Sequence, residues 1–210
     1  IQNYGDMGQK VGATWLPDNT IIFASPQQGG LRRVSASGGA SMALTQADRS
    51  LGAFHLWPEV LPGGGAVLLT IGGTGGPDTS QIAVLDLRTN ALKVLVSGGS
   101  NAHYAASGHL VYTAAGTLRA VPFDVNRLDV RGTAVPVVSR VAGSINGAAH
   151  FAVAANGTLA YADAFDALAS DARNLVWVDR TGKEEAIPAP PRAYVYPRLS
   201  PDGKRLALDI

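Results

Sequence analysis

A short hairpin pattern recurs along the chain and restricts what the chain can fold into. Its clearest copy is residues 196–210, YPRLSPDGKRLALDI, in which two short strand patterns flank a turn at Pro201, Asp202 and Gly203. Pro presets φ for the turn, the Asp side chain caps it, and Gly takes the positive φ that other residues resist. Because a hairpin this short cannot bury its own apolar face, it must be one unit of a larger repeat.

The spacing of the copies predicts a β-propeller. Four further copies precede the clearest one, and the turns align at Pro17, Pro62, Ala106, Ala155 and Pro201, which are 45, 44, 49 and 46 residues apart. A period of this length is typical of a propeller blade, which contains four antiparallel strands.

Two more strand patterns follow each of the first four hairpins, as a complete blade requires. They are expected at Leu31–Ser35 and Met42–Thr45, Gln81–Asp86 and Ala91–Val96, Thr117–Phe123 and Ala134–Val138, and Asn174–Asp179 and Glu184–Ile187. We therefore predict an all-β fold, a β-propeller of four-stranded antiparallel blades with four complete blades and the first two strands of a fifth. The chain is expected to be a single propeller domain, or a fragment of a larger one, with blades at about residues 11–47, 55–98, 101–140, 148–189 and 194–210.

The composition agrees with many short strands and argues against several classes of partner. The 25 Gly and 12 Pro are typical of a turn-rich chain, and residues 163–174 are the one candidate for a helix, where a long loop fits equally well. A net charge of +1 predicts no nucleic-acid partner and no attraction to an anionic membrane surface. The absence of Cys excludes a disulfide framework and fits both the cytoplasm and the periplasm.

The two ends suggest a piece of a longer protein. Residues 1–10, IQNYGDMGQK, do not form a signal peptide and lack an initiating Met, and residue 210 falls within a predicted strand. No run of about eighteen apolar residues occurs, so we predict no membrane contact by this piece.

Several segments resemble the TolB-type, WD-repeat-like propeller at the carboxyl end of bacterial receptor-like Ser/Thr protein kinases. They cover nearly the whole chain in order: Gly12–Trp15 with Pro17 and Asp18, Leu31–Val34 with Gly38 and Gly39, Trp57–Gly64, Gly108–Tyr112 with Gly116–Leu118, Val121–Asp124, Leu175–Arg180 with Gly182, and Pro190–Tyr194. The resemblance implies a cytoplasmic kinase domain, one membrane span and an extracytoplasmic propeller of more blades than are present in this chain. It thus implies a periplasmic or extracytoplasmic location, and a cytoplasmic one remains open.

The motifs of several enzyme classes are missing from the sequence. The Gly-rich loop with its Lys, the catalytic His-Arg-Asp and the Asp-Phe-Gly triplet of kinases are absent, as is the Gly-x-Ser-x-Gly elbow of α/β-hydrolases. Gly72–Gly76 has no Lys-Ser/Thr after it and is expected to be a hairpin loop. The spacing of His103 and His109 matches no zinc signature. We therefore predict that the chain is not an enzyme and needs neither a cofactor nor a metal.

Other conspicuous residues have structural explanations. Asp179–Gly182 lacks the alternating oxygen ligands of a calcium loop and is expected to be a hairpin turn. Asn156-Gly157-Thr158 could accept a glycan in a eukaryotic secretory pathway, but it also provides the Asn-Gly that a hairpin turn prefers. Trp15 and Trp177 fall at apolar strand positions and are expected to pack between blades.

Strand register suggests one binding site. The first strand of each blade borders the central channel, so its alternate residues face the lumen. Counting back three and five residues from the aligned turns gives two polar or aromatic sets, whose side chains we expect in the channel: Thr14, Glu59, His103 and Arg198, and Trp57, Asn101, His150 and Tyr196. They would hold a small polar ligand or a peptide end through opposite charges and stacking faces. The alternative is that they line a water-filled channel and pair with one another.

Two function classes remain open at this stage. The first is a non-catalytic sensor or scaffold propeller that binds a protein or small polar ligand, as part of a bacterial receptor-like kinase or a TolB-like protein. The second is the accessory propeller of a prolyl-oligopeptidase-type hydrolase whose catalytic domain lies outside this chain. The incomplete fifth blade adds a further expectation: its edge strand, residues 205–210, lacks a partner unless residues 1–10 supply one, so a homo-oligomer could complete it.

Overall fold

The computed structural model describes residues 11–25, 29–48, 53–144, 146–154, 156–164, 174–179, 181–200 and 205–209. They belong to two compact units whose boundary lies between Ala102 and His103 in the sequence. Within the described residues, no helix is long and apolar enough to cross a membrane.

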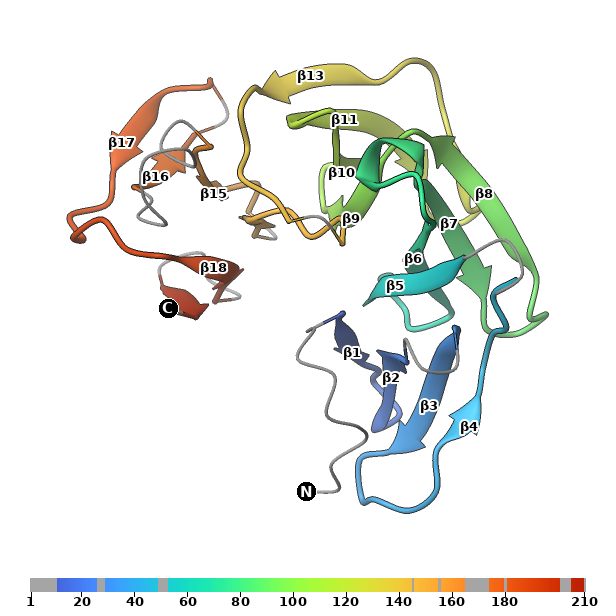
Figure 1. The fold of residues 1–210 in the computed structure, drawn as a ribbon. Helices are drawn as coiled ribbons and strands as arrows, with labels where there is room; N and C mark the ends of the chain where they lie inside the picture. The colour runs from blue at the N-terminus through green and yellow to red at the C-terminus, as the bar shows by residue number, and fades with distance from the viewer. Residues whose placement is uncertain are drawn as a thin grey trace. The chain divides into compact units, whose positions relative to one another are not determined.

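The first unit contains two four-stranded antiparallel sheets, and in each sheet the strands pair in chain order (Figure 1). The first sheet consists of β1 (Ala13–Trp15), β2 (Thr20–Ala24), β3 (Leu31–Ser35) and β4 (Met42–Ala43). The second sheet consists of β5 (Phe54–Val60), β6 (Ala66–Gly72), β7 (Gln81–Asp86) and β8 (Leu92–Ser97). A short 3-10 helix, η2 (Pro77–Thr79), lies in the loop between β6 and β7.

The second unit begins within β9 and contains the remaining sheets. One sheet has the order β12-β11-β10-β9, with β13 also paired to β11; its strands are β9 (Ser100–Ala105), β10 (His109–Ala114), β11 (Thr117–Asp124), β12 (Asp129–Val130) and β13 (Val135–Val138). A four-stranded sheet follows, with β14 (Phe151–Val153), β15 (Leu159–Ala162), β16 (Leu175–Val178) and β17 (Glu184–Ala186). The last pair is β18 (Val195–Leu199) and β19 (Leu206–Asp209).

These sheets confirm the predicted all-β architecture of four blades and the first two strands of a fifth. The predicted bounds of β3 and β7 match the structure, and the other strands differ by a few residues at their ends. One strand and the short helix η2 were missed. The strand, β12, forms a two-residue pairing with the end of β11, beside a turn in which Asp124 Oδ1 accepts from the N–H groups of Asn126 and Arg127. Most of the candidate helix, residues 165–173, lies outside the described residues.

The hairpin turns use the residues that the sequence indicated. Asp18 Oδ1 accepts from Thr20 N (2.9 Å), and Asn156 Oδ1 accepts from Thr158 N (3.0 Å). The turn glycines Gly63 and Gly108 have φ of 86° and 80°. These positive φ values and side-chain caps close the tight turns. The turn predicted at Asp202 lies outside the described residues.

A bulge interrupts β5 and breaks simple alternation. Leu56 pairs with Thr70 while Glu59 pairs with Leu68, so β5 has one extra residue between these pairs, and Trp57 there has φ of 53°. The positions five residues before two other turns are also left-handed: Gly12 has φ of 93° and Asn101 has φ of 51°, whereas His150 in the fourth blade does not have a positive φ. Because a bulge shifts the side-chain period, the unbroken alternation from Trp57 to Glu59 that the channel argument assumed does not hold.

Each unit has an aliphatic core between its sheets, but Trp15 is not part of one. Residues such as Leu31, Leu68 and Phe151 are almost completely buried. Trp15, in contrast, is 59% exposed, so the prediction that it packs between blades is wrong. It is the last residue of β1, and its Nε1 donates to Asn19 Oδ1 (3.3 Å) across the following turn. Trp177 is half-buried in β16.

Candidate functional site: a cavity between two sheets of the second unit

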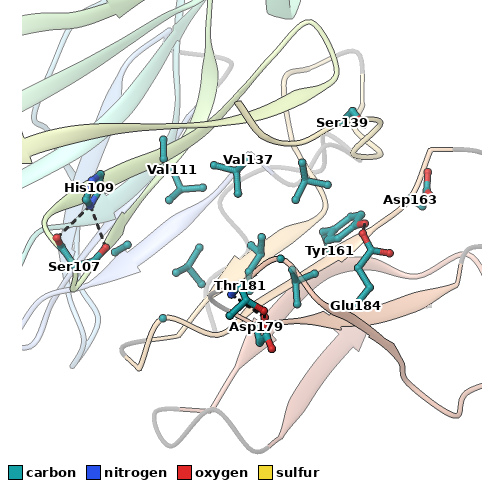
Figure 2. Close-up of a pocket in the computed structure, with 18 of the residues that line it drawn as sticks. Ser107, His109, Val111, Val137, Ser139, Tyr161, Asp163, Asp179, Thr181 and Glu184 are labelled. Atoms are coloured by element: carbon teal, nitrogen blue, oxygen red, sulfur yellow. Dashed lines mark hydrogen bonds between the residues drawn. The ribbon is translucent and has the colours of Figure 1, made fainter. Parts of the chain in front are cut away.

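A cavity of about 650 Å³ lies within the second unit, between the sheet that contains β9–β13 and the sheet that contains β14–β17 (Figure 2). Its walls are largely aliphatic and come from both sheets: Val111, Ala120, Val137, Val138, Val153, Leu159 and Val178. Polar side chains also line it: Ser107, His109, Ser139, Arg140, Tyr161, Asp163, Asp179, Thr181 and Glu184.

Strand periodicity places these side chains on facing surfaces. His109 and Val111 are two residues apart on β10, and Leu159 and Tyr161 are two residues apart on β15, so each pair lies on one face of its sheet. The residue between each pair, Leu110 or Ala160, faces away from the cavity and is fully buried. The cavity is therefore the space left between two sheet faces that each carry aliphatic and polar residues in alternation with core residues.

Tyr161 and Glu184 form the best-defined polar contact of the cavity. The Tyr161 hydroxyl donates to Glu184 Oε1 at 2.7 Å, and Figure 2 shows the two side chains pointing toward one another. Since Tyr161 is on β15 and Glu184 on β17, the contact spans the intervening strand β16. Tyr161 is only 4% exposed. Burial, followed by the hydrogen bond to Glu184, raises the pKa of Tyr161 far above its usual value, so the phenol stays neutral.

Arg140 and Asp163 form an ion pair at the same end of the cavity wall. Arg140 Nη2 lies 3.5 Å from Asp163 Oδ2, and both side chains are solvent-accessible. The backbone holds them together, because Val141 and Asp163 form a β-bridge and Ala164 N donates to the Arg140 carbonyl (2.7 Å). An exposed pair of this kind contributes little to stability, about 0–1 kcal/mol, but it fixes where the two charges lie.

Ser107 and His109 lie at the opposite side of the cavity in Figure 2. His109 Nδ1 is 3.1 Å from Ser107 Oγ and 3.1 Å from the Ser107 carbonyl oxygen. A carbonyl oxygen only accepts hydrogen bonds, so Nδ1 must carry the proton for that contact to form. Protonated Nδ1 cannot remove a proton from the Ser107 hydroxyl. The pair is thus not arranged as a nucleophile with its base.

Asp179 caps the turn between β16 and β17. Its Oδ1 accepts from Thr181 N (2.8 Å), Thr181 Oγ1 (2.6 Å) and Lys183 N (3.1 Å). These hydrogen bonds, first those from Thr181, lower the pKa of Asp179. This geometry agrees with the predicted hairpin turn. The part of the chain that the structure describes contains no group of three or more His, Asp or Glu side chains that could hold a metal ion.

The predicted channel residues lie elsewhere, on the first strands of the blades and next to them. In the first unit, Thr14 Oγ1 accepts from Val60 N (3.1 Å), next to Glu59 on β5. Trp57 and Asn101 are buried at the left-handed positions.

In the second unit, the His103 ring contacts the Phe151 ring edge-on, with centroids 4.8 Å apart, and His150 is buried beside Phe151 in sequence. Arg198 is exposed, and its Nη1 donates to the Pro197 carbonyl at 3.0 Å. The side chain of Tyr196 is outside the description. A shared channel lined by all eight residues stays a prediction.

None of the eight residues lines the cavity of Figure 2, so sequence analysis missed this candidate site. Most of the cavity residues come from later strands and turns of two blades, and the two on first strands, Ala105 and Val153, are not at the positions that the register argument selected. A signal was nevertheless present: His109 and Val111, and Leu159 and Tyr161, pair a large or polar residue with an aliphatic one on a single strand face. The space between the sheets, however, depends on packing and not on strand pattern.

No family model matches the sequence, and no curated protein matches it either. Solved structures do match. TolB from Acinetobacter baumannii is 20% identical with a TM-score of 0.64, and the match covers 93% of this chain and 47% of that one. The chain has a β-propeller fold. The propeller gluconolactonase from Xanthomonas campestris is 12% identical with a TM-score of 0.69, covering 94% and 68%. A streptogramin B lyase is 15% identical with a TM-score of 0.63, covering 94% and 61%.

The comparison corrects one prediction and limits others. This chain spans about half the length of the TolB chain, 47% of it, and identities this low establish the fold alone. The prediction that the chain is not an enzyme is contradicted, because the propellers of the same fold include a lactonase and a lyase. The prediction rested on contiguous motifs, whereas a site assembled from separate loops of a propeller needs no fixed spacing in the sequence.

Proposed function

We propose that this propeller is a ligand-binding module and that the cavity between β9–β13 and β14–β17 is its binding site. The proposal rests on the volume of this cavity together with the side chains that line it. A cavity of about 650 Å³ with aliphatic walls and a few polar groups has the size and chemistry of a small-molecule site. Tyr161 and Glu184, held by their hydrogen bond, provide a fixed polar group within that lining.

The proposed setting is a larger bacterial protein in which the module acts as a sensor or scaffold, either TolB-like or the extracytoplasmic part of a receptor-like Ser/Thr kinase. The segments that resemble kinase-associated propellers and the structural likeness to TolB support this setting. A periplasmic or extracytoplasmic location belongs to the same proposal. The accessory propeller of a prolyl-oligopeptidase-type hydrolase stays the alternative, and the sequence adjoining this chain in its parent protein distinguishes the two.

A cavity-filling variant tests the binding site. Val137 lines the cavity and is 49% exposed, so Val137→Trp should fill the space without disturbing the core. Val135→Trp is the matched control, because Val135 lies on the same strand, is 56% exposed and does not line the cavity.

The readout is the spectrum of valine methyl groups during titration with a panel of probes: pentylamine, pentanoate, 1-pentanol, glucose and inorganic phosphate. We expect at least one probe to shift the methyl signals of cavity residues Val111, Val153 and Val178, and not those of Val67 and Val84 in the first unit. Val137→Trp should abolish these shifts and Val135→Trp should preserve them. If every probe leaves the cavity methyls unchanged, or if Val137→Trp has no effect, the proposal is wrong.

A further inference from the structure

Building on the proposed function, we infer that the cavity selects a ligand with a cationic nitrogen on an aliphatic stem, such as an alkylammonium ion or a lysine side chain. The stem would lie along the valine walls and the nitrogen beside Tyr161 and Glu184.

The charges around the cavity favour a cation. Three carboxylates line it, those of Asp163, Asp179 and Glu184, against the guanidinium of Arg140. Arg140 is engaged by Asp163, and Asp179 is used to close its turn. Glu184 is different, because the partner of its carboxylate is the neutral hydroxyl of Tyr161. Its negative charge therefore remains available to a ligand.

Tyr161 strengthens the same preference. Its ring lines the cavity beside Glu184, and the faces of aromatic rings attract cations, Lys ammonium groups among them. The phenol donates its one proton to Glu184, which holds the carboxylate in place within the lining. A carboxylate next to an aromatic ring is a suitable environment for an ammonium group.

The aliphatic walls supply the second part of the selectivity. Val111 lines the cavity from β10, and Val153 and Val178 line it from β14 and β16 of the other sheet. Burying one methylene group is worth about a fourfold change in Kd. A ligand with a longer stem should thus bind more tightly until the cavity is filled, whereas a bare ammonium or a metal ion would leave the walls unused.

An anionic ligand is the main competitor, and the geometry disfavours it. The two lining side chains that could carry a positive charge are Arg140 and His109. Arg140 is paired with Asp163, and His109 Nδ1 is directed at Ser107. An anion would also have to approach the carboxylates of Asp179 and Glu184, and these negative charges would repel it.

The test compares probes of one shape and different charge. Pentylammonium, 1-pentanol and pentanoate are titrated into the full chain at pH 7, and Kd is taken from the shifts of the cavity valine methyls. We expect pentylammonium to bind at least about tenfold more tightly than pentanoate, and propylammonium to bind more weakly than pentylammonium by about fourfold per missing methylene. Glu184→Gln should weaken pentylammonium at least about fivefold and leave pentanol unchanged.

Glu185→Gln is the matched control, since Glu185 is the next residue on β17 and does not line the cavity. It should leave all three affinities unchanged. Tyr161→Phe gives a second reading, with pentylammonium binding weakened and pentanol binding retained. If pentanol or pentanoate binds the cavity as tightly as pentylammonium, the inference is wrong while the binding site itself stands. If no probe reaches the cavity methyls, both proposals fail.

Discussion

His55 Nδ1 lies 2.7 Å from Thr45 Oγ1, and this contact joins the start of β5 to the chain that leaves β4. Thr45 Oγ1 also accepts from Leu31 N at 2.8 Å, so this hydroxyl links His55 to the start of β3. The hydroxyl has both a hydrogen and a second lone pair, so it can pair with His55 Nδ1 in either tautomer of the neutral ring. His55 is buried, and burial lowers its pKa below the usual value of 6.5.

The protein should lose stability in mildly acidic solution because of this residue. With the pKa of His55 lower in the folded state, the unfolded state binds more protons as the pH falls below about 6.5, so the free energy of unfolding decreases. Urea unfolding at pH 7.5 and pH 5 should show a smaller pH effect for His55→Gln than for the wild type. An equal pH effect in both proteins would contradict this assignment.

Gly12→Ala should destabilise the first unit. Gly12 has φ of 93°, and a Cβ there would lie 2.9 Å from Trp57 Cα, so the substitution meets both backbone strain and a steric clash. We expect a loss of about 1–3 kcal/mol in the free energy of unfolding, measured by urea titration. Gly65→Ala is the control, because a Cβ at Gly65 meets no atom within 4 Å and needs no positive φ. Equal stability of the two variants would exclude the clash.

Thr70→Val should cost more than the loss of one hydroxyl suggests. Asn101 N donates to Thr70 Oγ1 at 2.9 Å, and both residues are buried, so removing the acceptor leaves a buried N–H group that has lost this hydrogen bond. The expected loss is about 1–3 kcal/mol. Thr70→Ser keeps the oxygen and should recover most of that loss, an outcome that separates the hydrogen bond from packing. Urea unfolding of the three proteins measures both effects.

Trp15→Ala should leave stability almost unchanged, despite the large side chain. Trp15 is 59% exposed, whereas Phe151 is completely buried in the second unit. We expect Trp15→Ala to change the free energy of unfolding by less than about 0.5 kcal/mol, and Phe151→Ala to cost about 3–5 kcal/mol. Iodide should also quench more fluorescence in the wild type than in Trp15→Ala. A strongly destabilised Trp15→Ala protein would contradict this expectation and would indicate that Trp15 packs between blades, as the sequence suggested.

The sequence was sufficient to predict the repeat but not the details of its first strands. Turn residues such as Asp18 and Asn156 indicate where a hairpin closes. The regular spacing of the five predicted turns along the sequence indicated the blades. The bulge at Trp57 has no comparable signal, because a large aromatic residue is not expected at a positive φ. The register argument therefore assumed an alternation that β5 does not keep.

The candidate site could not be predicted from strand patterns and turn spacing. Tyr161 and Glu184 are 23 residues apart and lie on strands that are not neighbours. Their meeting depends on how the Tyr161 ring crosses β16, which strand pattern does not specify. The pairing of β19 with another chain, or with residues 1–10, also stays a prediction, since those ten residues are outside the described part of the structure.

Gly12, Trp57 and Asn101 occupy equivalent places in successive blades, and all three have a left-handed backbone. Three side chains as different as hydrogen, indole and amide share this conformation, so in the first three blades the side chain does not decide it, whereas His150 at the equivalent place in the fourth blade does not adopt it. A consensus array based on the first three blades should therefore carry glycine at that place, because glycine alone adopts the conformation without steric cost. In the natural chain, Trp57 has a strained backbone at this place, and its ring is buried.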